Sequence, residues 1–365
     1  NGDVYYNLGL AYLKTDKLVQ SKDAFTRCIK ITPENGKAHY YLGTIYESIF
    51  KPNKAIDAYK LAKKYQVNID DINYRLGVLL YKNDYYKDAM EPLRQYIIQE
   101  PDSNSVLEKL GNIFIDQLRF QESIDVYNRL ITIFPDNIEY IRKLADSYWE
   151  IGNLNDAFFT YEMLLEFNEE DPEIFSRLGS LALELEDYTL AKKYLIESID
   201  CGISSFETYY NLALAYGNLE EYLQALLILK EAQKIEPENN DIYFQFGIIY
   251  FELELYLEAI ESLLIFITNS EENAFVFYLI GECYFALNDY ISALESFKIS
   301  FSLNSYDYRT LNYIGQCYYH IANYENAARN YKKSLNINPD DPITHYNLGL
   351  TYLELGKKRS AKKEL

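Results

Sequence analysis

Small and apolar residues recur along the whole chain with a period of 34 residues. Steps of that length from Gly9 meet a glycine or alanine every time, at Gly43, Gly77, Gly111, Ala145, Gly179, Ala213, Gly247, Gly281, Gly315 and Gly349. A Leu, Ile or Phe precedes each of them, and a Phe, Tyr or Leu stands sixteen residues later. Apolar residues at spacings of 3, 4 and 7 mark one face of a helix. The pattern predicts two amphipathic helices in every period.

The small residues indicate where these helices cross. An alanine or serine stands twelve residues after each Gly or Ala of the series, from Ser21 to Ala361. Close approach of two helices needs small side chains at the crossing, and large side chains fill the space around it. One helix pair cannot bury such a face alone, so successive pairs must stack. The sequence therefore predicts a solenoid of helical hairpins.

The periodic positions resemble the tetratricopeptide (TPR) repeat, whose 34-residue signature is Leu, Gly, Tyr, Ala, Phe and Pro. The resemblance implies an all-α, right-handed superhelical TPR solenoid in which the first helix of each repeat lines the concave side. The expected repeats are 2–35, 36–69, 70–103, 104–137, 138–171, 172–205, 206–239, 240–273, 274–307, 308–341 and a partial 342–365. Since nothing interrupts the register, we expect a single continuous array over residues 1–365.

Composition narrows the possible functions. The chain has 365 residues, of which 38 are tyrosine. Its formal net charge of -20 argues against nucleic-acid binding, because phosphate contacts need a basic face. Its apolar runs, such as Leu263 to Ile267, are far shorter than the ~18 residues of a membrane span. Because the chain starts at Asn1 and stops inside a repeat, we expect either a fragment of a longer protein or a protein whose tail is disordered. The compartment stays open between the cytoplasm and a bacterial periplasm or envelope.

Charge is distributed unevenly. Residues 2–69 hold 11 Lys and Arg against 6 Asp and Glu, whereas residues 138–307 hold 8 against 32. Residues 308–365 are basic again, with 9 against 5. A charge run is usually a solvated face. The alternation also allows an end of one molecule, or a basic partner, to dock on the acidic middle.

The resemblance places candidate binding residues at repeat positions 2, 5, 6, 9, 12 and 13, which build the concave face in TPR proteins. Repeats three to six carry a basic row there, formed by Arg75, Lys109, Arg142, Lys143 and Arg177. This row could bind carboxylates of an extended peptide or an acidic helix, with arginine as the bidentate partner. Alternatively, its members pair with acidic residues of adjacent repeats.

Repeats eight to ten carry an aromatic wall at the same positions, formed by Phe244, Phe251, Phe275, Tyr278, Phe285, Tyr313 and Tyr319. An aromatic surface of this size predicts an apolar anchor site for a partner helix or tail. The alternative is that these rings pack on each other or on the next superhelical turn.

Two binding modes known for the resembling family are not expected. The two-carboxylate clamp for chaperone C-termini needs Lys, Asn, Asn, Lys and Arg at five positions. Those positions hold Tyr6, Leu10, Tyr41, Asp71 and Arg75. Only Arg75 fits, so a co-chaperone function is disfavoured. An asparagine ladder at position 6 is also incomplete, with only Asn7, Asn211 and Asn347 in place.

Signals for catalysis are missing from the sequence. It contains no HExxH, CxxC, GxSxG, GxGxxG or P-loop motif, so no enzyme activity, cofactor or metal site is predicted. His39 and His345 occupy position 4, a packing position. All four cysteines, Cys28, Cys201, Cys283 and Cys317, are interpreted as core thiols.

The sequence thus predicts a non-catalytic scaffold that binds partner proteins in a groove and organises an assembly. Its Asn-, Ile-, Lys- and Tyr-rich composition is similar to that of spirochaetal proteins, which suggests a bacterial envelope or flagellar-motor complex. The alternative is the substrate-recruiting arm of an enzyme whose catalytic domain lies outside this chain.

Overall fold

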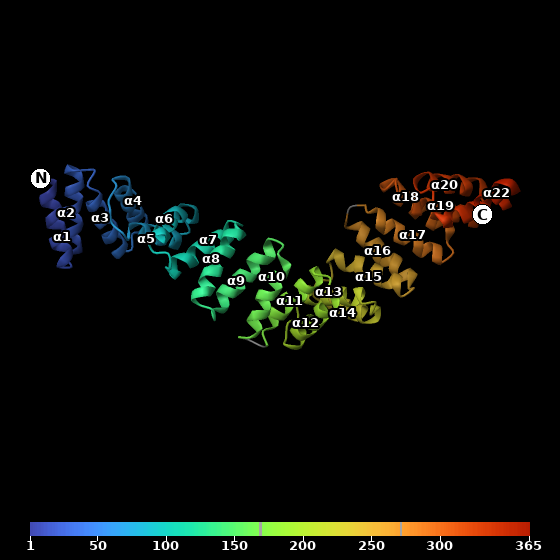
Figure 1. Cartoon of the computed structure of the whole chain (residues 1–365), viewed down its shortest axis with the longest axis horizontal. Helices are drawn as coiled ribbons and strands as arrows, with labels where there is room; N and C mark the ends of the chain where they lie inside the picture. The colour runs from blue at the N-terminus through green and yellow to red at the C-terminus, as the bar shows by residue number, and fades with distance from the viewer. Residues whose placement is uncertain (168–169, 271) are drawn as a thin grey trace. The chain divides into compact units, whose positions relative to one another are not determined.

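The chain is all-α in a computed structural model that describes residues 1–167, 170–270 and 272–365 (Figure 1). These residues form 22 helices and no strand, with one helical hairpin for every expected repeat. The chain divides into two compact units, an N-terminal unit Asn1–Glu169 and a C-terminal unit Glu170–Leu365. Continuity of a single array through the whole chain stays a prediction.

The N-terminal unit contains five hairpins. Their helices, paired in chain order, are α1 (Gly2–Lys14) and α2 (Leu18–Ile31), α3 (Gly36–Ser48) and α4 (Pro52–Lys64), α5 (Ile72–Lys82) and α6 (Tyr86–Gln99), α7 (Asn104–Asp116) and α8 (Phe120–Ile133), and α9 (Ile138–Glu150) and α10 (Leu154–Leu165). Within this unit, α2, α4, α6 and α8 each also pack on the first helix of the next hairpin. Stacking of neighbours therefore continues the core from hairpin to hairpin.

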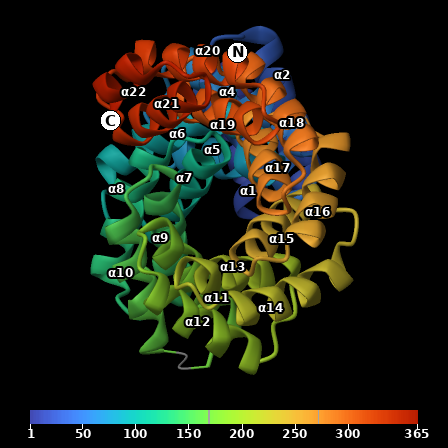
Figure 2. The same cartoon turned by 90° about the vertical axis from the view of Figure 1, so that its right-hand side faces the viewer.

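The C-terminal unit contains six hairpins built in the same way. They are α11 (Pro172–Glu184) and α12 (Tyr188–Asp200), α13 (Phe206–Asn218) and α14 (Tyr222–Ile235), α15 (Asn240–Glu252) and α16 (Tyr256–Thr268), α17 (Ala274–Ala286) and α18 (Tyr290–Leu303), α19 (Tyr308–His320) and α20 (Tyr324–Ile337), and α21 (Pro342–Glu354) and α22 (Lys358–Glu364). In Figure 2, α14, α16 and α18 lie on the outer side of this unit, and α13, α15 and α17 lie on its inner side.

Local sequence sets the start of most first helices. The side chain of Asn35 accepts a hydrogen bond from the Ala38 amide at 2.9 Å, which satisfies one of the free N–H groups at the helix start. The same end-of-repeat position supplies a side-chain cap at Asn1, Asn35, Asn137, Asp171, Ser205, Asn239, Asn273, Asp307 and Asp341. Pro172 and Pro342 follow their caps directly, where a missing N–H costs nothing.

A left-handed residue separates the two helices of each of the eleven hairpins. Non-glycine residues with positive φ recur one repeat apart at Asp16, Phe50, Asp84, Leu118, Glu186, Glu220, Glu254, Asn288 and Ala322. Glycine takes this place only at Gly152 and Gly356. The left-handed conformation costs an L-residue about 1 kcal/mol or more. Each hairpin thus turns at the same point, at some expense in stability.

The glycine series marks the closest contact between helices. A Cβ added at Gly315 would lie 2.5 Å from a ring carbon of Tyr331, sixteen residues later on the second helix. The small residue on the second helix also reaches this contact, since the Ser21 hydroxyl donates to the Gly9 carbonyl at 2.8 Å. Small residues therefore meet at the crossing as predicted, and the large ring is what excludes a side chain.

Aromatic rings sixteen residues after the glycine or alanine of the series lie at the centre of the core. Tyr59, Tyr127, Tyr161 and Tyr331 are among the largest fully buried side chains. Burial raises the pKa of Tyr59, Tyr127 and Tyr331 well above the usual range for a phenol. Part of the tyrosine excess is therefore packing.

The Gly315→Ala substitution should destabilise the C-terminal unit by about 1–3 kcal/mol, because the new methyl group overlaps the Tyr331 ring. Thermal unfolding followed by circular dichroism measures the loss. Gly217→Ala is the matched control, since nothing lies within 4 Å of a Cβ added there and the residue is helical. That variant should gain up to about 1 kcal/mol. Equal effects of the two substitutions would contradict the crossing argument.

The Leu118→Gly substitution should stabilise the N-terminal unit by about 0.5–1 kcal/mol. Leu118 has a φ of 56° and is 75% exposed, so glycine relieves backbone strain while little packing is lost. Gly152→Ala places an L-residue at a φ of 74° and should cost a similar amount. Chemical denaturation of both variants measures the opposite signs; a destabilised Leu118→Gly protein would argue against strain at these turns.

Candidate protein-binding site

Arg75, the first member of the basic row, lies in an intramolecular ion-pair network on α3 and α5. Its Nε is 2.6 Å from Asp71 Oδ2, and its Nη1 is 3.4 Å from Glu47 Oε2. The Tyr40 hydroxyl donates to Asp71 at 2.6 Å, and the buried Tyr59 donates to Glu47 at 2.8 Å. The guanidinium is therefore held between two carboxylates that core tyrosines orient.

Asn112 organises the next part of the row. Its Oδ1 accepts hydrogen bonds from Lys143 Nζ at 2.7 Å and from the Tyr127 hydroxyl at 2.8 Å, and its Nδ2 donates to the Tyr81 hydroxyl at 3.2 Å. Lys143 also pairs with Glu139 on its own helix at 2.8 Å. The hydroxyl of buried Tyr127 and the ammonium group of Lys143 thus donate to the same amide oxygen of Asn112.

The remaining basic residues have different surroundings. Lys109 Nζ donates to the carbonyl and the hydroxyl of Ser105 at 3.0 and 2.9 Å, and burial lowers the pKa of the lysine. Arg142 is half-buried on α9. Arg177 is exposed on α11 and lines an open recess of roughly 480 Å³ with Ser176 and Ser180. It belongs to the C-terminal unit, so the predicted row is divided between the two units.

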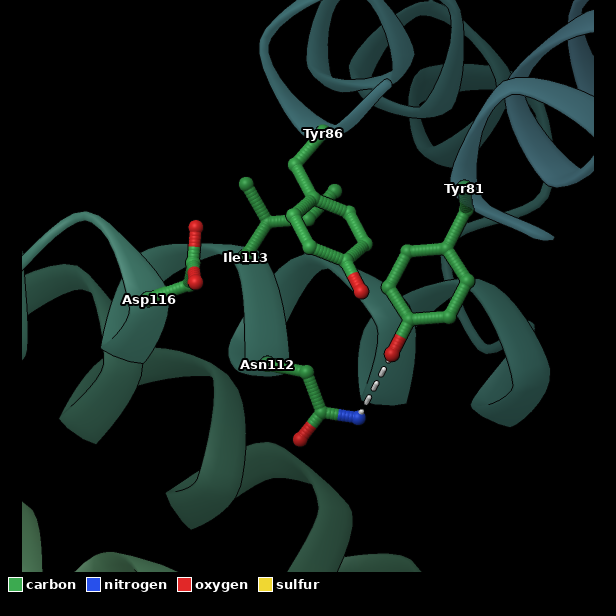
Figure 3. Close-up of a pocket in the computed structure, with 5 residues that line it drawn as sticks. All are labelled: Tyr81, Tyr86, Asn112, Ile113 and Asp116. Carbon is green, nitrogen blue, oxygen red and sulfur yellow. Dashed lines mark hydrogen bonds between the residues drawn. The ribbon is translucent and has the colours of Figure 1, made fainter. Parts of the chain in front are cut away.

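A small polar recess lies beside Asn112 on α7. Figure 3 shows Tyr81, Tyr86, Asn112, Ile113 and Asp116 around it, and its volume is roughly 190 Å³. Phenol, amide and carboxylate groups give it both donors and acceptors, and Ile113 adds an apolar floor. Such a recess suits one polar side chain or a stretch of peptide backbone rather than a small-molecule cofactor.

The aromatic wall separates into two clusters within the C-terminal unit. Phe244 packs on Phe266, with ring centroids 5.1 Å apart, and on Phe275 at 6.5 Å. The second cluster joins Tyr278 to Tyr313 at 5.7 Å and Tyr313 to Phe285 at 5.5 Å. Much of the wall therefore packs on itself.

Two further members of the predicted wall make only local pairs. Phe251 packs edge-on against Tyr256 at 6.0 Å, and Tyr319 packs against Tyr324 at 5.3 Å. Phe275, at 52% exposure, is the one predicted wall residue among the exposed large apolar residues.

A partly buried acid lies within the second cluster. The Tyr313 hydroxyl donates to Glu282 Oε1 at 2.8 Å. Burial raises the pKa of Glu282 from its ordinary value, against the opposing effect of its tyrosine hydrogen bonds and nearby Arg309. Glu282 was not among the predicted site residues, although it occupies repeat position 9, as Asn112 does. Counting that position in every repeat would have found it.

An open recess of roughly 280 Å³ adjoins this cluster, lined by Tyr278, Tyr308, Arg309, Asn312, Tyr313, Gln316, Asp341 and Ile343. Arg309 is 67% exposed at its side chain and Ile343 is 62% exposed. Inside the recess, Gln316 donates to Asn312 at 2.6 Å. A cation, an aromatic wall and an exposed aliphatic group therefore border one hollow.

Two of the three histidines, His39 and His345, make hydrogen bonds with the backbone at the ends of repeats. The Nε2 atoms of His39 and His345 each lie 2.8 Å from a carbonyl at the end of a repeat, that of Pro33 or Pro339. Within the described residues, no group of three or more His, Cys, Asp or Glu could hold a metal ion, and no helix is long and apolar enough to span a bilayer.

Three of the four cysteines lie in the core, as predicted. Cys28, Cys283 and Cys317 are buried, and burial raises the pKa of Cys283 and Cys317 to about 12. The prediction for Cys201 was wrong. This residue follows the last turn of α12 and is exposed, because it lies beyond the helix face that packs on α13.

Models of one repeat family match several parts of the chain. Those described as "Tetratricopeptide repeat" match residues 2–35, 71–138, 172–200 and 206–239, and one described as "TPR repeat" matches 315–356. Together they cover more than half of the chain, and three matches begin where the expected repeats begin. The chain belongs to the tetratricopeptide repeat family, and this membership supports a protein–protein interaction scaffold.

Individual relatives are distant. The chain is 23% identical over 184 residues to the "Tetratricopeptide repeat-containing protein trd-1" of Caenorhabditis elegans, a match that covers 49% of this chain but only 23% of trd-1. It is 20% identical over 194 residues to the "Type IV pilus assembly protein PilF" of Pseudomonas aeruginosa, covering 53% of this chain and 77% of that protein.

Solved structures confirm the predicted fold class. The C-terminal part of a TPR repeat-containing protein from Cytophaga hutchinsonii aligns with a TM-score of 0.51 at 18% identity. The alignment covers 60% of this chain and 91% of that structure. It shows a shared all-α solenoid fold.

The Glu282→Gln substitution should stabilise the C-terminal unit near neutral pH. Because the folded state holds the Glu282 proton more tightly than the unfolded state, stability falls as pH rises from the unfolded pKa through the raised folded pKa. Glutamine cannot ionise and still accepts from Tyr313. We expect a gain of about 0.5 kcal/mol at pH 7, seen as a shift in Tm, that shrinks toward about pH 4.

Glu295→Gln, at an exposed site on α18, is the control and should leave the pH profile of Tm unchanged. A Glu282→Gln gain of the same size at both pH values would show that ionisation of this carboxyl is not the cause.

Proposed function

We propose that this protein is a non-catalytic scaffold. It binds a partner protein on the first helices of the last three hairpins, α17, α19 and α21, in its C-terminal unit. The observation that carries the proposal is the open recess in which Tyr278, Tyr313, Arg309 and Ile343 meet. An exposed aliphatic group, aromatic walls and a cation at one hollow fit an apolar anchor residue followed by a carboxylate.

The chemistry of the recess favours a peptide or helix over a small substrate. Its volume of roughly 280 Å³ suits one or two side chains, and it is open to solvent. Exposed Phe275 on the preceding repeat extends the apolar surface. A partner segment lying across the three repeats 274–307, 308–341 and 342–365 would bury these groups together.

The basic row supports a second contact region in the same binding function. Arg75 and Lys143 are held in position by acids and amides, which lowers the entropy lost on binding. Exposed Arg177 is the member best placed to meet an acidic residue of a partner. An acidic segment on the row and an apolar segment in the recess would make the contact bivalent.

The process served by the scaffold is a further part of the proposal. Composition similar to that of spirochaetal proteins, and a relative named as a pilus assembly protein, support a bacterial envelope or flagellar-motor assembly. Basic ends and an acidic middle support self-association as a second mode. The alternative, a substrate-recruiting arm of an enzyme, requires a catalytic domain outside this chain.

Affinity capture from the native source, followed by direct titration of the captured partner, tests the recess. A variant with Phe275→Ala, Arg309→Glu and Ile343→Asn changes only exposed side chains, so the fold should persist. Loss of the recess contacts should weaken the affinity for the partner at least about tenfold.

The matched control changes Ile98→Ala and Leu118→Ala, which are 77% and 75% exposed in the N-terminal unit and lie outside the recess. It should bind like the wild type. If every captured partner binds the recess variant with unchanged affinity while circular dichroism shows an intact fold, the recess is not the binding site.

A further inference from the structure

Three consecutive repeats of the C-terminal unit expose a large aliphatic residue at the same place. Leu223 on α14, Leu257 on α16 and Ile291 on α18 are 64%, 67% and 65% exposed. Each is the second residue of its helix, and successive members are 34 residues apart in the sequence. We call these three residues the outer apolar row.

Other repeats show that the fold does not require an aliphatic residue there. The same repeat position holds a polar or charged residue in seven of the other eight repeats, namely Asn53, Lys87, Gln121, Asn155, Thr189, Glu325 and Arg359. Only Val19 in the first repeat is also apolar. A side chain that is two-thirds exposed adds little packing, and a contiguous apolar surface reduces solubility. The row therefore calls for an explanation outside the fold.

The row lies away from the recess of the proposed groove site. Its residues belong to second helices, which Figure 2 shows on the outer side of the C-terminal unit, whereas the helices of the recess begin their repeats. Leu227, one turn beyond Leu223 on α14, is 65% exposed, and Leu264 on α16 is 42% exposed. These two widen the apolar surface.

Acidic residues border the row. Glu254, Glu258, Glu261 and Glu295 are exposed within four residues of Leu257 or Ile291. None of the four forms an ion pair within the part of the chain that the structure describes. Residues 206–307 hold 3 Lys and Arg against 17 Asp and Glu. Of the three bases, Lys234 pairs with Glu231 at 2.6 Å and Lys298 lies over the Tyr318 ring at 5.4 Å. The acidic border is therefore uncompensated.

We propose that the outer apolar row is a docking surface for an amphipathic helix of a partner protein whose apolar stripe is flanked by lysine or arginine. Charge complementarity selects this occupant: aliphatic residues bind the stripe, and the unpaired carboxylates bind the flanking cations. An acidic border repels anionic lipid, which excludes a membrane surface of that kind. The site is separate from the groove and does not depend on the proposed function.

Synthetic helices test the surface without knowledge of the natural partner. The probe is a fluorescent peptide of about 20 residues with leucine at helical spacings of 3, 4 and 7 and lysine on both sides of that stripe. A second peptide replaces every lysine with glutamate. A third scrambles the first so that composition and charge stay the same and the apolar stripe disappears. Fluorescence anisotropy against the whole chain reports each affinity.

Substitutions follow the residues that the chain itself uses at this position. The test variant carries Leu223→Thr, Leu257→Asn and Ile291→Gln, and the matched control carries Val19→Asn at an equally exposed site (67%) in the N-terminal unit. We expect the lysine peptide to bind the wild type and the control equally, and the test variant at least about tenfold more weakly. A Glu258→Lys, Glu261→Lys variant should also bind it more weakly and lose salt dependence.

Several outcomes would overturn the proposal. Equal binding of the scrambled peptide would show attraction by net charge alone, and equal binding of the glutamate peptide would remove the role of the acidic border. Unchanged affinity of the test variant would move the site elsewhere. Sedimentation would overturn the assigned occupant if the wild type dimerised and the test variant did not, since a second copy would then cover the row.

Discussion

Contact between a glycine on one helix and a large ring or leucine on the next is the interaction on which this structure depends. A Cβ added at Gly43 would lie 2.6 Å from Tyr59, and one at Gly247 would lie 2.4 Å from Leu263. Because the two backbones approach within one side chain's thickness, each hairpin has one crossing geometry. The remaining apolar residues then stack one hairpin on the next, and the solenoid follows from repetition.

That core also organises the polar surface above it. Tyr59 and Tyr127 bury their rings at the crossing but extend their hydroxyls to Glu47 and Asn112. These acceptors in turn hold Arg75 and Lys143. A surface cation is therefore connected to the core through two hydrogen bonds, which fixes its position before any partner arrives. Packing and recognition use the same tyrosines.

The two proposed surfaces of the C-terminal unit differ in how they relate to the fold. In the recess, Tyr278 and Tyr313 both pack against the core and line the binding surface. A partner would therefore contact side chains that the fold already needs for its stability. On the outer side, Leu223, Leu257 and Ile291 contribute little to packing. Their position is free to vary, as the polar residues of the other repeats show, and it is therefore where a second partner could be specified.

The sequence by itself determined the helix pairs and the fold class, because the 34-residue pattern records contacts inside a hairpin that recur along the chain. Only the tertiary structure decided how single side chains pair. Arg75 meets Glu47 of the preceding repeat, Glu282 lies half-buried under Tyr313, and Cys201 is exposed just beyond its helix. Such pairings depend on distances between stacked repeats and on which rotamers remain available, and neither is recorded in the period of a sequence.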